Sequence, residues 1–346
     1  MRSSVRRLVL AAVLVLATLG SSFAAGGPWV HRAQASAPRI RVGYFPNITH
    51  AQAVLGFGTG AFAHALPGVR GEVFNAGPDE MNALFAGALD IGYIGAGPAI
   101  KGYVASHGGL YIVAGAATGG SLLVARAGTG IKTVKDLAGK RVAIPQLGNT
   151  QDILLRALLA RAGLAPTERG GTVRLLAVQN PDTLALFERG DLDAALVPEP
   201  WGSRLVKTTG ARIVLDWRQI DGGTTPVAVV IVAAPFLKAH PDLVVRFLRV
   251  HVQLTRQLQG THLGQSKSGV AAALNAQIKA LTGKALSAGV LASALARTSF
   301  STTIDQRALT RFAGYSIAAG YLKKDAKIAG LVNTWPLAHL NDAAIK

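Results

Sequence analysis

The feature that most constrains this chain is an internal repeat in which a helix, a glycine, a buried strand and a polar loop follow one another. One copy spans Gly77–Pro98 and the other spans Asn180–Trp201. Aligned without gaps, the copies match at Pro78 and Pro181, Asp79 and Asp182, Gly87 and Gly190, Leu89 and Leu192, and Asp90 and Asp193. Proline near a helix start and glycine after its end are typical helix signals. The repeat predicts two similar lobes, and the cleft between them is the expected place for a small ligand.

Each predicted lobe also begins in the same way. Ile40–Tyr44 and Arg141–Ile144 have the pattern of strands, and each runs into a polar turn that contains proline and then into a helix. Strands that alternate with helices predict an α/β fold with a parallel sheet in each lobe. Ligand-binding loops are then expected at the carboxyl ends of the strands.

Two apolar segments, Leu122–Ala125 and Val227–Val232, each follow a glycine-rich polar stretch and read as buried strands. We interpret them as two crossing strands between the lobes, with the glycines absorbing hinge rotation. The predicted first lobe is 38–122 plus 228–346, and the predicted second lobe is 123–227. Beyond Phe236, helices are expected on the first lobe at Leu243–Leu258, Val270–Leu281, Ala285–Ala296, Asp305–Ala319 and Ala326–Leu331.

The first 37 residues have the pattern of a signal peptide and spacer. Basic residues precede the apolar run Leu8–Leu19, and small residues suited to cleavage follow. Both an ordinary secretory signal and a twin-arginine signal fit, and an uncleaved anchor is an alternative. We therefore expect an exported, periplasmic protein. The chain has no cysteine, so a lipid-modified N-terminal cysteine is not expected.

Composition narrows the possible functions. The 346 residues are half apolar, which suffices for two domains of ordinary size. Without cysteine the chain has no disulfides, thiolate catalysis, cysteine-bound zinc or iron–sulfur cluster. The formal charge of +18 is compatible with binding to nucleic acid or an anionic membrane, but the cations are scattered rather than clustered. We expect a generally basic surface and no nucleic-acid partner.

Uncharged polar residues gather at the predicted helix starts. They suit an oxyanion that is held by hydrogen bonds and helix N-termini rather than by counter-charges. Each is equally compatible with ordinary helix capping. These candidate ligand-binding residues are Asn47, Thr49, His50, Gln146, Asn149 and Thr150.

The loops that end the two repeats supply further candidates. Gly95, Ala96 and Gly97 would allow close approach of a backbone to a ligand. In the other loop, the carboxylate of Glu199 is expected to bind a ligand or orient another side chain, and Trp201 to cover the ligand. The alternative is that Glu199 caps the loop and Trp201 fills core.

No catalytic, metal or cofactor site is predicted. His50 is the only candidate general base near these loops, and no serine or cysteine nucleophile pattern accompanies it. The sequence contains no phosphate loop, nucleotide fingerprint or metal-ligand spacing.

Several ordered segments resemble one known family, the substrate-binding proteins of ABC importers in the nitrate, sulfonate and taurine group. The resemblance extends from about Arg39 to about Ala319, and the Asp136–Ala143 segment is the least specific part of it. The matching segments are Val42–Ala51, Phe74–Pro78, Gly87–Gly95, Asp136–Ala143, Pro145–Asp152 and Val197–Trp201.

The resemblance implies a type II periplasmic-binding-protein fold, in which two α/β lobes joined by two crossing strands close on a ligand. It implies a monomer without cofactor or chemistry, whose partners are a membrane permease and its ATPase. It also implies that loops beginning at Tyr44, Gly95, Ser121, Gln146 and Glu199 line the cleft. Ligand binding then selects the closed state.

The resemblance leaves the ligand open. An aliphatic sulfonate is the first choice, because three oxygens suit neutral donors. Glu199 stands where some sulfonate binders have aspartate, and a glutamate facing the anion would repel it. Nitrate, taurine, bicarbonate and a thiamine-precursor pyrimidine therefore remain alternatives. Thiamine-pyrimidine synthases, which are enzymes, and a class of transcription-factor effector domains share the lobes, but either function would require that residues 1–37 do not export the chain.

Overall fold

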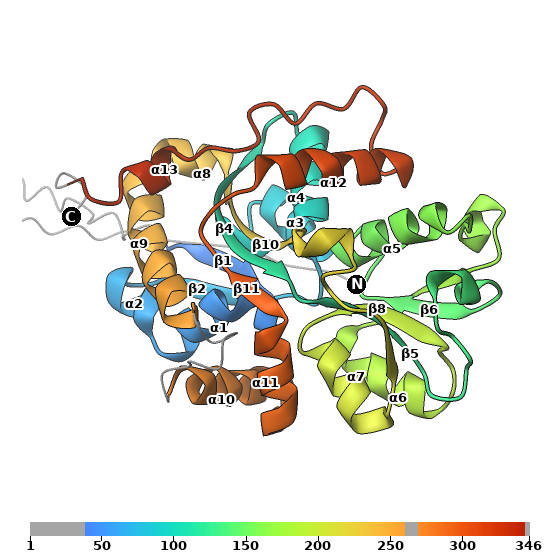
Figure 1. Cartoon of the computed structure of the whole chain (residues 1–346). Helices are drawn as coiled ribbons and strands as arrows, with labels where there is room; N and C mark the ends of the chain where they lie inside the picture. The colour runs from blue at the N-terminus through green and yellow to red at the C-terminus, as the bar shows by residue number, and fades with distance from the viewer. Residues whose placement is uncertain (1–38, 260–268, 343–346) are drawn as a thin grey trace, which may run out of the picture. The chain divides into compact units, whose positions relative to one another are not determined.

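Two separate β-sheets form the framework of the computed structural model, which describes residues 39–259 and 269–342 (Figure 1). The strands of the first sheet, in spatial order, are β11 (Thr298–Phe300), β4 (Leu110–Gly119), β10 (Pro226–Ala233), β3 (Ile91–Ile94), β1 (Arg41–Tyr44) and β2 (Arg70–Val73). The strands of the second sheet are β7 (Arg174–Ala177), β6 (Arg141–Ile144), β8 (Ala194–Pro198), β5 (Ser121–Ala125) and β9 (Arg212–Leu215). Helices pack around both sheets, so each sheet defines one α/β lobe, as predicted.

The two sheets share one strand order, which confirms the predicted repeat. In the first, β1 lies between β2 and β3 and is parallel to both, and β10 pairs antiparallel with β3. In the second, β6 lies between β7 and β8 and is parallel to both, and β5 pairs antiparallel with β8. The strand that pairs antiparallel with the repeat strand, β10 in the first sheet and β5 in the second, is one of the two apolar segments interpreted as crossings. The carboxyl ends of the parallel strands carry the loops between the lobes.

The repeated unit itself folds as predicted. In the first lobe it forms α3 (Gly77–Phe85), β3 and the start of α4 (Ala96–Ala105). In the second it forms the 3-10 turn η4 (Asn180–Asp182), α6 (Thr183–Glu188), β8 and the start of α7 (Trp201–Thr209). Gly87 and Gly190 follow the first helix of each copy with φ of 68° and 77°, in the left-handed region that glycine adopts without strain.

An arginine–aspartate pair ties the start of each lobe to its repeat. The carboxylate of Asp90 accepts hydrogen bonds from the backbone N–H of Arg41 at 2.8 Å and from its guanidinium at 2.7 and 3.0 Å. Asp193 accepts the same set from Arg141 at 2.9, 3.0 and 3.1 Å. In each lobe, the guanidinium also donates to the carbonyl of the repeat glycine, at 2.6 Å. These pairs fix the first strand of each lobe beside the strand of the repeat.

Glycines occupy both crossings between the sheets. β4 ends at Gly119 and Gly120 separates it from β5, whereas residues 216–225 separate β9 from β10. Gly119 and Gly223 have φ of 76° and 73°, and a Cβ added to either would lie within 2.8 Å of the Trp217 ring. The indole of Trp217 therefore packs against both crossings at once. The predicted lobe limits at 122/123 and 227/228 stay a prediction.

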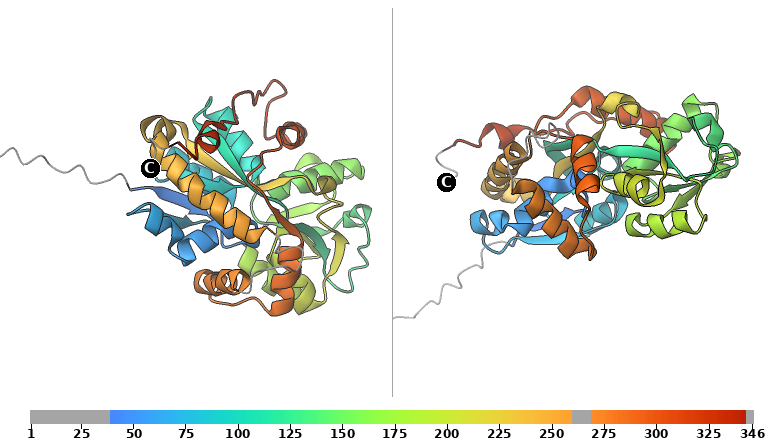
Figure 2. Two further views of the ribbon diagram at one scale, coloured as in Figure 1. Left: turned by 60° about the vertical axis from the view of Figure 1, so that its left-hand side comes forward. Right: turned by 60° about the horizontal axis from the view of Figure 1, so that its bottom comes forward.

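The helices after β10 lie mainly on the first lobe. Those that pack there are α8 (Ala234–Ala239), α9 (Pro241–Leu258), α10 (Val270–Thr282) and α13 (Trp335–Ala338). Of these, α9 and α10 pack against α1 (Ala51–Gly58), and α9 also packs against α2 (Ala61–Ala65) (Figure 2). By contrast, α11 (Ala288–Ala296) contacts β11 of the first sheet and α7 of the second lobe, and α12 (Gln306–Ala318) contacts both α4 of the first lobe and α5 (Thr150–Arg161) of the second.

One expectation for the C-terminal part is wrong, and one strand there was not expected. Residues Ala326–Leu331 form turns rather than a helix, and Tyr103 Oη donates to the Ala329 carbonyl within this segment. The short strand β11 was not expected; it pairs antiparallel with the end of β4. The predicted signal peptide and spacer, residues 1–37, lie outside the described residues. Within the described ranges, no helix combines the length and apolar character needed to cross a membrane.

We expect Asp193→Ala to lower the free energy of unfolding by about 1–3 kcal/mol, because it leaves the partly buried backbone N–H and guanidinium of Arg141 without their acceptor. The matched control is Asp191→Ala, which removes an exposed ion pair with Arg189 from the same turn and should change stability by less than about 1 kcal/mol. Urea titrations followed by circular dichroism measure both. Equal effects of the two variants would contradict the anchoring role.

Candidate functional site

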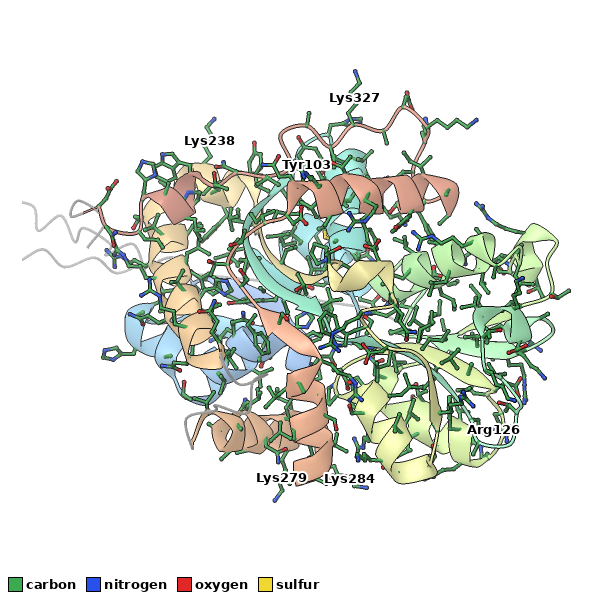
Figure 3. All side chains as sticks on the ribbon, viewed as in Figure 1. Tyr103, Arg126, Lys238, Lys279, Lys284 and Lys327 are labelled. Atoms are coloured by element: carbon green, nitrogen blue, oxygen red, sulfur yellow. The ribbon has the colours of Figure 1, made fainter. Side chains whose placement is uncertain are left out.

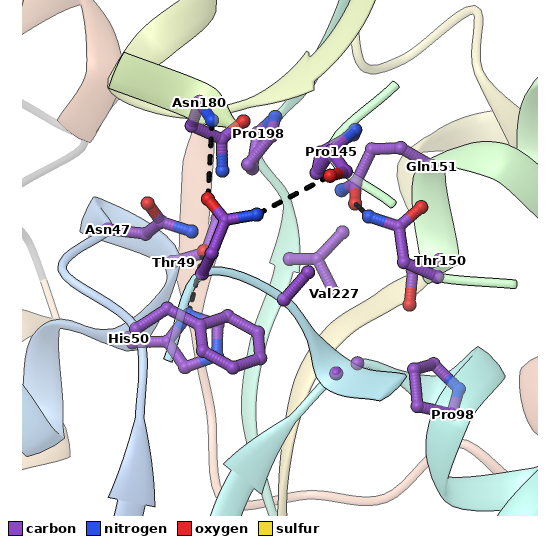
Figure 4. Close-up of a pocket in the computed structure, with 16 residues that line it drawn as sticks. Asn47, Thr49, His50, Pro98, Pro145, Thr150, Gln151, Asn180, Pro198 and Val227 are labelled. Atoms are coloured by element: carbon purple, nitrogen blue, oxygen red, sulfur yellow. Dashed lines mark hydrogen bonds between the residues drawn. The ribbon is translucent and has the colours of Figure 1, made fainter. Parts of the chain in front are cut away.

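A small, mostly uncharged cavity lies where the loops of the two lobes meet (Figure 4). Its volume is about 20 Å³, little more than the space that one water molecule needs. The first lobe contributes Phe45, Asn47, Thr49, His50, Asn75, Ala76, Gly77, Gly95, Pro98 and, from β10, Val227. The second lobe contributes Pro145, Asn149, Thr150, Gln151, Asn180 and Pro198.

Helix starts from both lobes converge on this cavity. In the first lobe these are the 3-10 turn η1 (Ile48–His50), which leads into α1, and the first residues of α3 and α4. In the second lobe, α5 and η4 begin there. Helix N-termini present backbone N–H groups and the positive end of the peptide dipoles. The cavity is therefore positively polarised without a charged side chain.

His50 lies in the wall of the cavity as a neutral imidazole. Its Nε2 is 3.1 Å from the Tyr93 carbonyl oxygen, which can only accept, so Nε2 carries the proton. Nδ1 then accepts a hydrogen bond from the Thr49 hydroxyl at 3.0 Å. Burial lowers the pKa of His50 to about 3, and the Tyr93 carbonyl opposes this shift. His50 consequently adds no positive charge to the site near neutral pH.

The lobes touch directly across the cleft. The Asn75 side chain bridges them, since its Oδ1 accepts from the Asn180 backbone N–H at 3.2 Å and its Nδ2 donates to the Pro145 carbonyl at 3.4 Å. The Trp201 indole donates to Asn47 Oδ1 at 2.7 Å, and the neighbouring Ile48 N–H donates to the Glu199 carbonyl at 3.1 Å. These bonds describe a closed arrangement of the lobes.

The carboxylate of Glu199 is buried beside the cleft rather than in its lining. It accepts from the backbone N–H and the hydroxyl of Ser203, at 3.0 and 2.8 Å. Arg297, at the end of α11, lies 3.7 Å from the carboxylate and donates to the Ser203 hydroxyl at 2.9 Å. Burial raises the pKa of Glu199, although the Ser203 bonds and Arg297 act in the opposite direction. The carboxylate thus caps the start of α7, as the alternative reading of the sequence held.

The structure brings together six of the thirteen candidate site residues in the cavity lining. These are Asn47, Thr49, His50, Gly95, Asn149 and Thr150.

The other candidates lie around the cavity. Tyr44 is buried and stacks on Phe57 with ring centroids 5.1 Å apart. Ser121 accepts from Gln151 at 3.1 Å, and Gln146 donates to Asp79 across the mouth of the cleft at 2.9 Å.

Two candidates lie at the start of α4 and one at the start of α7. Ala96 is buried, and the backbone N–H of Gly97 donates to Thr150 Oγ1 at 3.4 Å. Trp201 is only 4% exposed and makes its contact with the ligand loops through Asn47. Whether any candidate residue binds a ligand stays a prediction.

Sequence reasoning did not select several lining residues, notably Asn75, Gln151 and Asn180. Asn75 follows β2 and precedes the proline-containing start of α3. Asn180 is the first residue of the second repeat. Their position at a strand end or helix start was the available signal. The sequence does not indicate that the two asparagines meet across the cleft.

Positive side chains are spread over the outside. Lys238, Lys279, Lys284 and Lys327 are exposed and project from different sides of the structure in Figure 3. No lysine or arginine lines the cavity described above. Among residues 39–259 and 269–342, no three His, Asp or Glu side chains are grouped to hold a metal ion.

Comparison with known proteins agrees with this architecture. The model of the NMT1-like family matches residues 33–274, which is most of the chain. The chain belongs to the NMT1-like family. The taurine-binding periplasmic protein of Escherichia coli (strain K12) is 29% identical over 178 residues, which are 51% of this chain and 53% of that protein. The chain spans about half the length of the curated relatives it matches.

Solved structures show the same fold. The alkanesulfonate-binding protein SsuA from Xanthomonas axonopodis pv. citri, bound to MOPS, superposes with a TM-score of 0.71 at 23% identity, over 86% of this chain and 99% of that chain. The periplasmic nitrate-binding protein NrtA from Synechocystis PCC 6803 gives 0.68 at 16% identity, over 88% and 89%. The predicted two-lobed binding-protein fold is confirmed. At these identities the likeness concerns the fold alone.

We expect Gly95→Val to hold the lobes apart. A Cβ at Gly95 would lie 2.0 Å from Thr150 Oγ1 of the opposite lobe and 3.3 Å from the Val227 carbonyl oxygen. Small-angle scattering should give a larger radius of gyration than for the unaltered protein. Gly314→Ala, which meets open space on α12, is the control and should leave the scattering unchanged. Identical scattering of Gly95→Val and the unaltered protein would remove this loop from the closing surface.

Proposed function

We propose that this protein is an extracytoplasmic solute-binding protein that captures a small oxyanion between its lobes, and that the oxyanion is an aliphatic sulfonate. The observation that carries the proposal is the convergence of helix starts from both lobes on one cavity without charged side chains. Such a site stabilises an anion through backbone N–H groups and dipoles. The positive ends of the same dipoles would repel a cation.

Neutral side chains complete the proposed anion site. The cavity lining includes Asn47, Asn149 and Thr150, whose amide and hydroxyl groups can donate to sulfonate oxygens. The name of the taurine-binding relative and the alkanesulfonate bound by the structural neighbour support this class of ligand. The sulfonate group would lie at the helix starts, with its organic part towards the mouth of the cleft.

Nitrate is the second candidate. The closed cavity, at about 20 Å³, favours a small planar anion over one with an organic tail, and a nitrate-binding protein shares the fold. A sulfonate with a tail requires the lobes to close less tightly than in this structure. The same helix starts would serve either anion.

Delivery to a membrane permease and its ATPase is part of the proposal, as are a periplasmic location and a monomeric state. The binding-protein names of the relatives support a role in capture rather than catalysis. In that role ligand affinity depends on the free energy of lobe closure as well as on contacts with the ligand.

A thermal-shift screen of the chain from Arg39 onward tests the proposal. The ligands are alkanesulfonates, taurine, nitrate, bicarbonate and an aminopyrimidine. A ligand bound only by the folded state raises the unfolding temperature. A shift with one sulfonate supports the proposal, and a shift with nitrate alone replaces the sulfonate by the second candidate. A shift with the aminopyrimidine alone overturns the oxyanion assignment.

We expect Trp201→Phe to weaken binding of the ligand found in this screen by about tenfold, because it removes the buried bond to Asn47 that joins the lobes in the closed state. Isothermal calorimetry measures the change. Trp335→Phe alters an exposed tryptophan outside the cleft and is the control. An unchanged dissociation constant for Trp201→Phe, with the fold intact by circular dichroism, would count against its role in closure.

A further inference from the structure

One carboxyl group in the first lobe has no role in the site described so far. Glu80, on α3, is fully buried, and neither of its side-chain oxygens has a hydrogen-bond partner among the described residues. A carboxylate in such a place would be strongly disfavoured, because an ionised group without a partner is costly to bury. Burial accordingly raises the pKa of Glu80 well above its usual value.

The sheet beneath Glu80 is shaped to receive its carboxyl group. A Cβ added to Gly43 of β1 would lie 2.4 Å from Glu80 Oε1, and one added to Gly92 of β3 would lie 2.3 Å from the same atom. Gly43 and Gly92 are paired in the sheet register. The side chain therefore fits only because both strands lack side chains at this point.

The second lobe has no carboxyl group at the position that corresponds to Glu80. There the paired positions are Ala143 and Ala195, and the residue that corresponds to Glu80 is Thr183. Thr183 is buried but satisfies its hydroxyl on the Gln179 carbonyl at 3.3 Å. A glutamate with two glycines thus replaces a threonine with two alanines. The hollow, which is the space left by the absent side chains of Gly43 and Gly92, therefore occurs together with the carboxyl group that fills it, and only in the first lobe.

Glu80 lies one layer below the cavity. Phe45 and Ile94 come two residues after Gly43 and Gly92, so they lie on the same face of the sheet, nearer the cleft. Phe45 lines the cavity, and Gly77, one turn before Glu80 on α3, lines it too. Two residues of strand correspond to roughly 7 Å. At that depth a negative charge would act on an anion in the cleft with little screening by solvent.

The ionisable groups on the described strands beside Gly43 and Gly92 are engaged elsewhere, and Tyr44 of β1 stacks on Phe57. On β1, Arg41 is paired with Asp90. On β3, the Tyr93 hydroxyl bonds to His251 at 2.9 Å. β10 carries no ionisable side chain.

The ionisable groups of the two neighbouring helices are also engaged elsewhere. On α4, Lys101 lies over the Tyr321 ring and Tyr103 binds Ala329. Asp79 on α3 itself binds Gln146 across the cleft mouth.

We propose that Glu80 is a proton-binding site beneath the cleft, and that the proton it holds favours capture of an anion between the lobes. The coupling rests on the proposed anion-binding function, whereas the proton site does not. Loss of the proton places a like charge below the bound anion and is expected to weaken binding roughly tenfold. The protein would then hold its anion more tightly on the acid side of the Glu80 titration than on the alkaline side.

The test compares the unaltered protein with Glu80→Gln, which keeps the shape of the protonated group and cannot ionise. Infrared difference spectra of the ligand-free proteins first report whether a protonated carboxyl band is lost in the variant. Calorimetry with methanesulfonate, from about pH 5 to about pH 9, then measures the dissociation constant across the range in which buried glutamates titrate. Glu188→Gln, an exposed position on α6, is the control.

We expect the band to disappear in Glu80→Gln only, and affinity to fall more steeply with rising pH in the unaltered protein and in Glu188→Gln than in Glu80→Gln. His50 and His251 do not titrate in this range, because burial lowers their pKa values to about 3 and about 4. Glu199, whose pKa burial also raises, is present in all three proteins, so the difference between Glu80→Gln and the other two reports on Glu80. A missing carboxyl band overturns the proton site. The same pH profile in Glu80→Gln overturns the coupling. If methanesulfonate binds at no pH, the proposed anion function and the coupling fail together, while the band still decides the proton site.

The pH dependence of the unfolding free energy of the ligand-free protein is a second test of the proton site. A carboxyl group with a raised folded-state pKa contributes stability below its unfolded-state pKa, and that contribution is lost as pH rises through the folded-state value. The unfolding free energy of the unaltered protein should therefore fall relative to that of Glu80→Gln as pH rises. A constant difference between the two proteins would overturn the proton site even if the variant is less stable throughout.

Discussion

The two arginine–aspartate pairs hold the framework on which everything else depends. Each joins the first strand of a lobe to the strand of its repeat through a backbone N–H as well as a guanidinium, so it fixes strand register and not only charge. With β1 beside β3 and β6 beside β8, the carboxyl ends of these strands release their chains at one edge of each sheet. The helix starts that meet in the cleft are a consequence of that placement.

The site is neutral in a strongly basic protein, and the two facts are compatible. The chain carries a formal charge of +18, yet the cavity is lined by amides, hydroxyls, a neutral imidazole and backbone. Positive polarisation comes from peptide dipoles, which are fixed by the fold and do not have to be desolvated as a lysine or arginine would. For the anion proposed as the ligand, the distributed outer cations would act at long range and the dipoles at contact.

The fold could be predicted because its signals are local and occur twice. Proline and aspartate start the helices, Gly87 and Gly190 end them, and the strands that follow are continuously apolar. The site was predictable only as a set of loops. Asn75 gains its importance from Asn180 and Pro145, which are far away in sequence, and Glu199 turns to Ser203 and Arg297 instead of the cleft. The bonds of Asn75 and the contact of Glu199 with Arg297 join residues far apart in the chain, so no spacing in the sequence predicts them, whereas Ser203 is only four residues from Glu199. The strand β11 was missed for the same reason, since its partner β4 lies far back in the chain.

The indole ring of Trp217 contacts both crossings between the sheets. Its ring packs against Gly119 of one crossing and Gly223 of the other, at distances that leave no room for a methyl group on either. A torsional change at either crossing is therefore expected to move a ring that the other crossing also contacts. Rotation of the lobes would then involve the two crossings together rather than one at a time.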